Sequence, residues 1–139
     1  MVVTIDLVIP GAPVAKGRPR FSRRSGRTFT PAKTAQAEET LAGRAMALLA
    51  GVEGLPLQGP LRLEATFTSV QPSSWSKKKR AETPAPTSRP DVDNLLKLAT
   101  DALNGVVWVD DAQLVTIICR KVYGDTPSTR LIVTKEHAS

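Results

Sequence analysis

The apolar residues of this chain change repeatedly between the two-residue spacing of strands and the wider spacing of helices. The expected strands are residues 2–9, 61–68, 114–122 and 130–134, and the expected helices are residues 31–50 and 91–103. The order strand, helix, strand, helix, strand, strand is typical of an α+β fold. We therefore expect a small mixed β-sheet covered on one face by two helices.

The segments between these elements carry turn and loop residues. The first helix is expected to open with Thr30 as N-cap and Pro31 in the first helical position. Residues 12–29 are expected to form an extended basic loop or an irregular hairpin. The last two strands are expected to be joined by a turn at residues 124–127, and residues 106–109 form a short apolar run.

The length of 139 residues suits one domain that spans residues 1–139. Residues 71–90 are rich in proline and serine and include a run of four basic residues, so we expect a mobile basic loop there. No secretory leader is visible, and no stretch approaches the roughly 18 apolar residues of a membrane span. These observations predict a cytoplasmic protein with no membrane partner.

Few residues are available for thiol or imidazole chemistry. Cys119, the single cysteine, lies in an apolar run and is expected to be a core residue. The single histidine, His137, lies close to the C-terminus, where chains usually fray, and is not expected to be catalytic. No cysteine and histidine set for zinc is present.

The charge distribution favours a polyanionic partner. Nineteen Lys and Arg residues against thirteen Asp and Glu residues give a net charge of +6. No acidic residue lies between Leu7 and Ala37, whereas the window from Asp91 to Asp111 holds five acids and one base. We expect two basic segments to bind DNA through Lys16, Arg18, Arg20, Arg23, Arg24, Arg27, Lys77, Lys78, Lys79 and Arg80.

The two tryptophans are expected to differ in role. Trp75 lies in the polar segment, where it could stack on an unpaired base or, as we favour, fold back onto the core. Trp108 is expected to pack in the core and to position Asp110 and Asp111.

The acidic window carries the pattern most typical of chemistry. Asp91 and Asp93 are expected at a loop-to-helix junction with their carboxylates on one side, because they are two positions apart in extended chain. Lys97 is one helical turn beyond Asp93. Clustered carboxylates suit Mg²⁺, which would activate a water and neutralise a phosphate, while Lys97 could stabilise charge or protonate the leaving oxygen. The same residues could instead be a helix cap, a surface ion pair and a turn.

Three segments together resemble one family, the RusA Holliday junction resolvases. These segments are Arg89-Pro90-Asp91-Val92-Asp93-Asn94-Leu95-Leu96-Lys97, Asp101-Ala102-Leu103-Asn104 and Trp108-Val109-Asp110-Asp111-Ala112-Gln113, with further similarity at residues 16–20 and 28–31. The resemblance spans residues 8–135. The segment at residues 72–89 departs from the motif.

The resemblance implies a homodimeric endonuclease, dependent on Mg²⁺ or Mn²⁺, that cuts two strands across a four-way DNA junction in recombination and repair. It implies that Asp91, Asp93 and Asp111 are the metal-binding catalytic acids and that Lys97 is an essential base, with Asp110 a weaker candidate. Phage or prophage origin is also compatible with this family.

Three other functions remain open. A restriction-type nuclease is disfavoured, because Lys121 has Cys119 where that motif needs an acid. A less selective branched-DNA nuclease would share the chemistry with a broader substrate. A non-catalytic DNA-binding module would use the aspartates only to cap and orient a helix.

Overall fold

The structure, a computed structural model, describes residues 3–17, 20–29 and 31–136. Its main sheet has the strand order β1-β6-β4-β5, with β1 at Val3–Pro10, β4 at Leu61–Ser69, β5 at Leu114–Tyr123 and β6 at Ser128–Lys135. β6 pairs antiparallel with both β1 and β4, whereas β4 and β5 are parallel. The sheet is therefore mixed, as expected.

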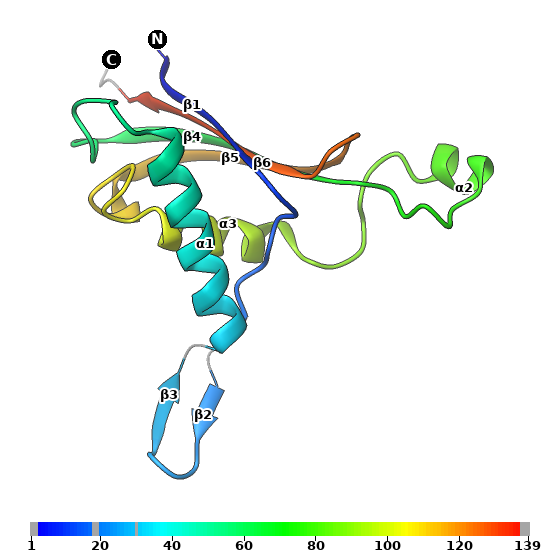
Figure 1. Ribbon diagram of the computed structural model, residues 1–139, viewed down its shortest axis with the longest axis horizontal. Coiled ribbons are helices and arrows are strands. Elements are labelled where there is room, and N and C mark those ends of the chain that lie inside the picture. Colours follow the sequence, from blue (N-terminus) through cyan, green and yellow to red (C-terminus); the bar gives the residue numbers. More distant parts are fainter. Residues whose placement is uncertain (1–2, 18–19, 30, 137–139) are drawn as a thin grey trace.

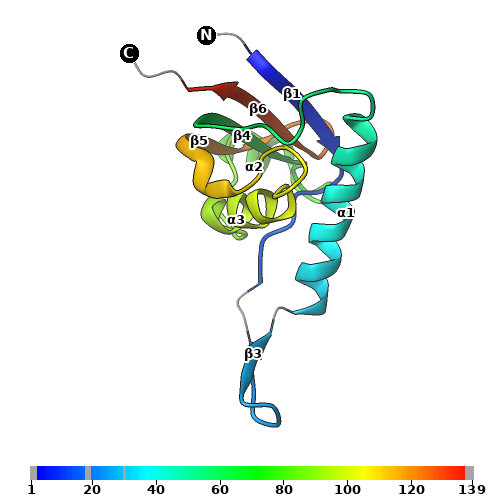
Figure 2. The same ribbon diagram turned by 90° about the vertical axis from the view of Figure 1, so that its left-hand side faces the viewer.

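Two helices lie on one face of this sheet (Figures 1 and 2). They are α1 at Ala32–Leu48 and α3 at Val92–Ala102. β1, β4 and β6 present alternate apolar side chains to these helices, as the burial pattern of β4 shows, whereas the residues of the edge strand β5 are half-buried or exposed. The predicted α+β architecture is confirmed.

The parallel pairing of β4 with β5 determines where α3 lies. Parallel neighbours need a crossover connection that carries the chain back to the same end of the sheet. Here the chain leaves β4, forms α2 at Lys77–Glu82, crosses the sheet as α3 and enters β5 through the short 3-10 helix η1 at Asp111–Gln113. The crossover thus places the acidic window of the sequence beside the edge strand β5.

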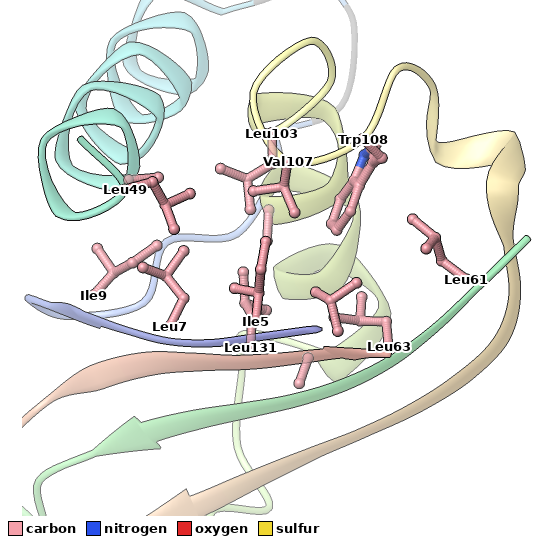
Figure 3. Packing of buried hydrophobic residues seen from close by; sticks show 14 of the residues in the cluster. Ile5, Leu7, Ile9, Leu49, Leu61, Leu63, Leu103, Val107, Trp108 and Leu131 are labelled. Atoms are coloured by element: carbon pink, nitrogen blue, oxygen red, sulfur yellow. The ribbon is translucent and has the colours of Figure 1, made fainter. Parts of the chain in front are cut away.

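The core lies between the sheet and the two helices (Figure 3). β1 contributes Ile5, Leu7 and Ile9, and the segment after α3 contributes Leu103 and Trp108, each less than one-tenth exposed. Burial of side chains of this size contributes about 1.5–3 kcal/mol each relative to exposure. Trp108 packs in the core, as predicted, and anchors the chain shortly before the acidic turn.

Several boundaries differ from expectation. α1 begins at Ala32 with Pro31 in the N-cap position, one residue later than predicted, while Thr30 lies outside the described residues. The short apolar run at residues 106–109 forms a turn with isolated bridges. β5 and β6 are both present, but they are not neighbours in the sheet, because β4 lies between them and pairs with both.

The proline-rich segment is more ordered than a loop of this composition suggests. Its basic run forms α2, because the Ser76 hydroxyl caps the helix by accepting from the Lys79 N–H at 3.1 Å. Gln71 donates to the carbonyls of Arg80 and Thr83 at 3.1 and 3.0 Å. The prediction of a loop is therefore wrong for Lys77–Glu82, which is helical, while the mobility of this segment stays a prediction.

Trp75 organises this segment. Its ring contacts Tyr123 edge-on at 5.9 Å between centroids, and the Lys79 ammonium lies 5.3 Å from its ring. Trp75 folds back onto the end of β5 and not onto the core, so the prediction of packing on the core is wrong.

A two-stranded arm projects from the body in both views (Figures 1 and 2). It consists of β2 at Arg20–Ser22 and β3 at Arg27–Phe29, paired antiparallel. The turn between them includes Gly26 at a φ of 68°, a conformation that glycine adopts without strain. The hairpin alternative is confirmed for residues 20–29, whereas residues 12–17 form no strand.

None of the helices in the described ranges is long and apolar enough to cross a membrane. Cys119 is a free, half-buried residue that packs against the core.

Candidate active site

Helix α3 carries three charged side chains along one face. Asp93 is in its first turn, and Lys97 and Asp101 follow at successive intervals of four residues, about one turn each. The opposite face buries Leu95 and Ala99 against the sheet. The amphipathic pattern that predicted the helix therefore also directs the charged row away from the core.

The acidic turn before β5 is held by one glutamine. The side-chain oxygen of Gln113 accepts from the backbone N–H groups of Val109 and Asp110 at 2.8 and 3.0 Å. Its amide nitrogen donates to the carbonyls of Leu57 and Gly59, both at 2.9 Å. Gln113 thus fixes the backbone on both sides of Asp111, a role that the sequence did not suggest.

Trp108 supports the same turn from within the core. It is fully buried, its indole N–H donates to the Asn104 side chain at 2.9 Å, and its carbonyl accepts from the Gly105 N–H at 2.7 Å. The expectation that Trp108 positions the aspartates after it is consistent with these contacts.

These elements bring Asp93, Lys97 and Asp111 together. The three side chains line one hollow of about 180 Å³, along with Leu96, Thr100, Leu114 and Ile117. The hollow lies between α3 and the start of β5. Two predicted metal ligands and the predicted base thus share a site, although Asp111 is 14 or more positions from the other two.

Asp91 is in a different place from that expected. It occupies the N-cap position of α3 without capping the helix through its side chain, and it lines an adjoining hollow with Arg89 and Asn94. Because the helix begins at Val92, Asp91 and Asp93 are not related by extended chain, and the prediction that they lie on one side is wrong. Within residues 3–17, 20–29 and 31–136, no group of three acidic, His or Cys side chains is arranged to hold a metal ion.

Asp101 is a site residue that sequence reasoning missed. One of its carboxylate oxygens accepts from Lys97 at 3.1 Å, and the other accepts from Lys16 at 2.5 Å. Lys16 also lies 3.1 Å from Glu38 of α1. The spacing of four residues from Lys97 was a signal for the first contact, but nothing in the sequence indicates the second, which joins residues 85 positions apart.

The charges in this network shift the pKa values of its members. Burial raises the pKa of Asp101, but the hydrogen bonds from Lys16 and Lys97 outweigh that effect, and the net pKa is lowered. The hydrogen bond to Asp101 raises the pKa of Lys16 despite partial burial. Asp101 is therefore a carboxylate, and Lys16 an ammonium, at neutral pH.

Asp111 shows the opposite behaviour. Burial raises its pKa, and the neighbouring carboxyls of Asp101 and Asp110 raise it further, while the positive charge of Lys97 acts in the lowering direction. Negative charge is thus crowded around Asp111.

Strand β5 supports the site from the sheet side. The Lys121 ammonium donates to the carbonyls of Ser88 and Pro90, both at 3.0 Å, and so ties down the loop that leads into Asp91. Burial, together with the negative charge of Asp93, raises the pKa of the Cys119 thiol. Lys121, which was considered above as the lysine of a restriction-type nuclease motif, has this structural role instead.

The predicted DNA-binding cations fall into three groups. Arg23, Arg24 and Arg27 are exposed on the arm, and Lys77, Lys78 and Lys79 are exposed on α2. Lys16 and Arg80 are only partly exposed and make internal contacts, in which Arg80 donates to the carbonyls of Trp75 and Pro72. Arg18 and the side chain of Arg20 lie outside the described residues, and DNA contact by all of these cations stays a prediction.

The similarities of this chain to known proteins indicate one family. The model of the family described as "Endodeoxyribonuclease RusA" matches residues 10–134. The chain is also 31% identical over 140 residues to a Bacillus subtilis (strain 168) protein named "Uncharacterized protein YqaN", and the match covers 93% of this chain and 94% of that protein. The family match includes the arm, α3 and the acidic turn. The chain therefore belongs to the RusA family of endodeoxyribonucleases.

Proposed function

We propose that this nuclease cuts four-way DNA junctions by paired, metal-dependent phosphodiester hydrolysis in recombination and repair. The observation that carries the proposal is the hollow shared by Asp93, Lys97 and Asp111. It combines two carboxylates and an ammonium beside the first turn of a helix, a composition suited to a phosphate and a divalent cation. Family membership supports the nuclease class, and the preference for junctions is part of the proposal.

The donors in this hollow fit Mg²⁺, with Mn²⁺ as a substitute. Mg²⁺ takes one or two carboxylates and keeps several waters, and a substrate phosphate completes its coordination. Asp93 and Asp111 provide two such carboxylates, and burial, with the nearby carboxyls of Asp101 and Asp110, raises the pKa of Asp111, an effect that a bound cation would oppose. When bound there, a divalent cation would lower the pKa of a water and neutralise charge on the phosphate.

Asp91 stays a predicted catalytic acid and metal ligand. It lies in the adjoining hollow, and its carboxylate does not cap α3, so its side chain can rotate without breaking the helix start. We propose that it joins the site when substrate and cation are both present.

Lys97 supplies positive charge at the reacting phosphate. Its side chain is 59% exposed, so its ammonium can donate to a phosphate oxygen or deliver a proton to the leaving oxygen. We propose that Asp101 limits the positions of this ammonium, and that Lys16 in turn holds Asp101. Asp101 and Lys16 are then positioning residues, since they act through Lys97.

The two basic projections, the arm and α2, support DNA as the substrate, because they spread positive charge over a wide area of the surface. In Figure 1 the arm and α2 extend from the body in different directions, and the loop after α2 returns to the start of α3. Cations on both projections can bind phosphates on either side of the hollow. A second copy of the chain would supply the second cut, because a two-fold enzyme matches a two-fold junction.

Cleavage of labelled four-way junctions, flaps and linear duplexes with and without Mg²⁺ or Mn²⁺ tests this function. We expect metal-dependent cutting that is fastest on the junction. Asp93→Asn should abolish cutting and retain DNA binding, whereas Asp125→Asn, a matched change in the exposed turn between β5 and β6, should leave both unchanged.

Two outcomes favour the alternatives. Binding without cleavage under either metal supports a DNA-binding module. Equal cutting of the three substrates supports a less selective nuclease.

A further inference from the structure

The arm presents a large aromatic side chain to solvent. Phe21 in β2 is 63% exposed, the most exposed of the large hydrophobic residues in the described part of the chain. It lies opposite Thr28 in the two-stranded pairing, and Ser22 lies opposite Arg27, so Phe21 and Arg27 are on opposite faces of the arm. A single exposed hydrophobic residue is ordinary on a protein surface, but this ring lies on a projecting arm, where a bound partner can cover it.

The charge of the arm indicates the class of that partner. Arg23, Arg24 and Arg27 are all exposed around the turn, and no acidic residue lies between Leu7 and Ala37. Such a concentration of positive charge disfavours a basic or neutral protein surface and favours phosphates. A nucleic acid is also the partner that offers an aromatic face next to those phosphates.

The base of the arm is firmly attached to the body. The backbone N–H of Lys16 donates to the Asn94 carbonyl at 3.0 Å, and the N–H of Gly17 donates to the Thr34 hydroxyl at 2.9 Å. Lys16 also reaches Asp101 in the catalytic helix. Lys16, shortly before the arm, therefore lies beside the first turn of α3, and DNA that extends from the hollow can reach the arm.

From these observations we propose that Phe21 stacks on an unpaired base at the branch point of the DNA substrate. In intact duplex DNA every base face is covered by its neighbours, whereas a branch point exposes bases that an aromatic ring can cover. The arginines of the arm then bind phosphates of either substrate, while Phe21 distinguishes branched from linear DNA. This inference rests on the proposed function and adds a residue that selects the substrate.

Binding measured without divalent ions tests this role independently of cleavage. The probes are a four-way junction with 2-aminopurine at the branch point and a linear duplex of equal length. Phe21→Leu keeps an apolar side chain but removes the ring, and we expect a loss of junction affinity of about 5- to 100-fold with duplex affinity within about twofold. The 2-aminopurine fluorescence change seen with the wild type should disappear.

Two further variants serve as controls. Phe21→Tyr keeps an aromatic ring and should restore both junction affinity and the fluorescence change. Met46→Leu changes a side chain of similar exposure, 59%, near the end of α1 that is far from the arm, and should behave as the wild type does.

Three results would overturn the inference. Phe21→Leu could leave junction affinity and fluorescence unchanged, or it could weaken junction and duplex binding equally, which would indicate a general contact. It could also change the oligomeric state in light scattering, which would assign Phe21 to a protein interface. In each case the wild type would still cut junctions, whereas failure of the proposed function would appear as wild-type protein that neither prefers nor cuts branched DNA.

Discussion

The ion pair between Lys16 and Asp101 gives a quantitative prediction. The two side chains are 22% and 17% exposed, and their charged atoms are 2.5 Å apart. Exposed pairs contribute about 0–1 kcal/mol, whereas breaking a buried pair costs about 3–5 kcal/mol. The intermediate burial of this pair places the cost of Asp101→Asn at about 2 kcal/mol, or about 6–8 °C in Tm for a chain of this size.

A double-mutant cycle with Lys16→Met and Asp101→Asn measures the interaction itself. We expect a coupling energy of about 1–2 kcal/mol in urea unfolding. The pair Lys78 and Glu82 is a matched control, because it has the same charges at 4.0 Å with side chains 85% and 62% exposed. Its coupling should be at most about 0.5 kcal/mol.

The same variants separate a positioning role from a purely structural one. If Asp101 holds Lys97, then Asp101→Asn should lower kcat by about tenfold or more while KM for DNA changes little, since small misplacement of a reacting group is costly. Lys16→Met should shift kcat in the same direction. Coupling no larger than that of the control pair, or a change confined to KM, would refute the reasoning.

Three more predictions follow from other contacts. Gln113→Ala removes four hydrogen bonds that hold the acidic turn, so we expect a loss of about 1–3 kcal/mol in urea unfolding and slower cleavage with unchanged DNA binding. The Arg130 guanidinium lowers the pKa of Asp6, so the stability from this pair is present above the ordinary pKa of an aspartate and is lost as pH falls through the lowered value. The Tm difference between wild type and Asp6→Asn should therefore vanish in acid and shrink in high salt. A Tm difference that stays constant would contradict the assignment. Replacing Arg23 and Arg24 with alanine should weaken DNA binding and reduce its salt dependence by about one slope unit per lost phosphate contact, and an unchanged slope would remove the arm from the interface.

The elements of the fold were more predictable than their arrangement. The apolar spacing that includes Leu95 and Ala99 predicts α3 because one helix face must be buried, and the alternation from Leu61 to Phe67 predicts β4 for the same reason in a strand. Strand order could not be predicted in this way, because periodicity carries no information on which strands pair. The parallel pairing of β4 with β5, which brings Asp111 to α3, depends on the crossover as a whole.

The residues that line the hollow were predictable only in part, and their geometry was not predictable. Asp93 and Lys97 could be placed together because both lie on one helix face, whereas the position of Asp91 depended on the residue at which the helix starts. The four-residue spacing to Asp101 and the serine before the lysines of α2 were local signals that could have been used. The contact between Asp101 and Lys16 is long-range and needed the structure.

The central claim is that Asp93 and Asp111 hold one divalent ion beside Lys97. Anomalous scattering from crystals soaked in Mn²⁺ tests it directly, with wild type compared to Asp93→Asn under the same conditions. We predict one peak within coordination distance of both carboxylates in the wild type and loss of that peak in the variant. Mn²⁺ bound elsewhere, or carboxylates that stay apart with no ion between them at saturating Mn²⁺, would contradict the account.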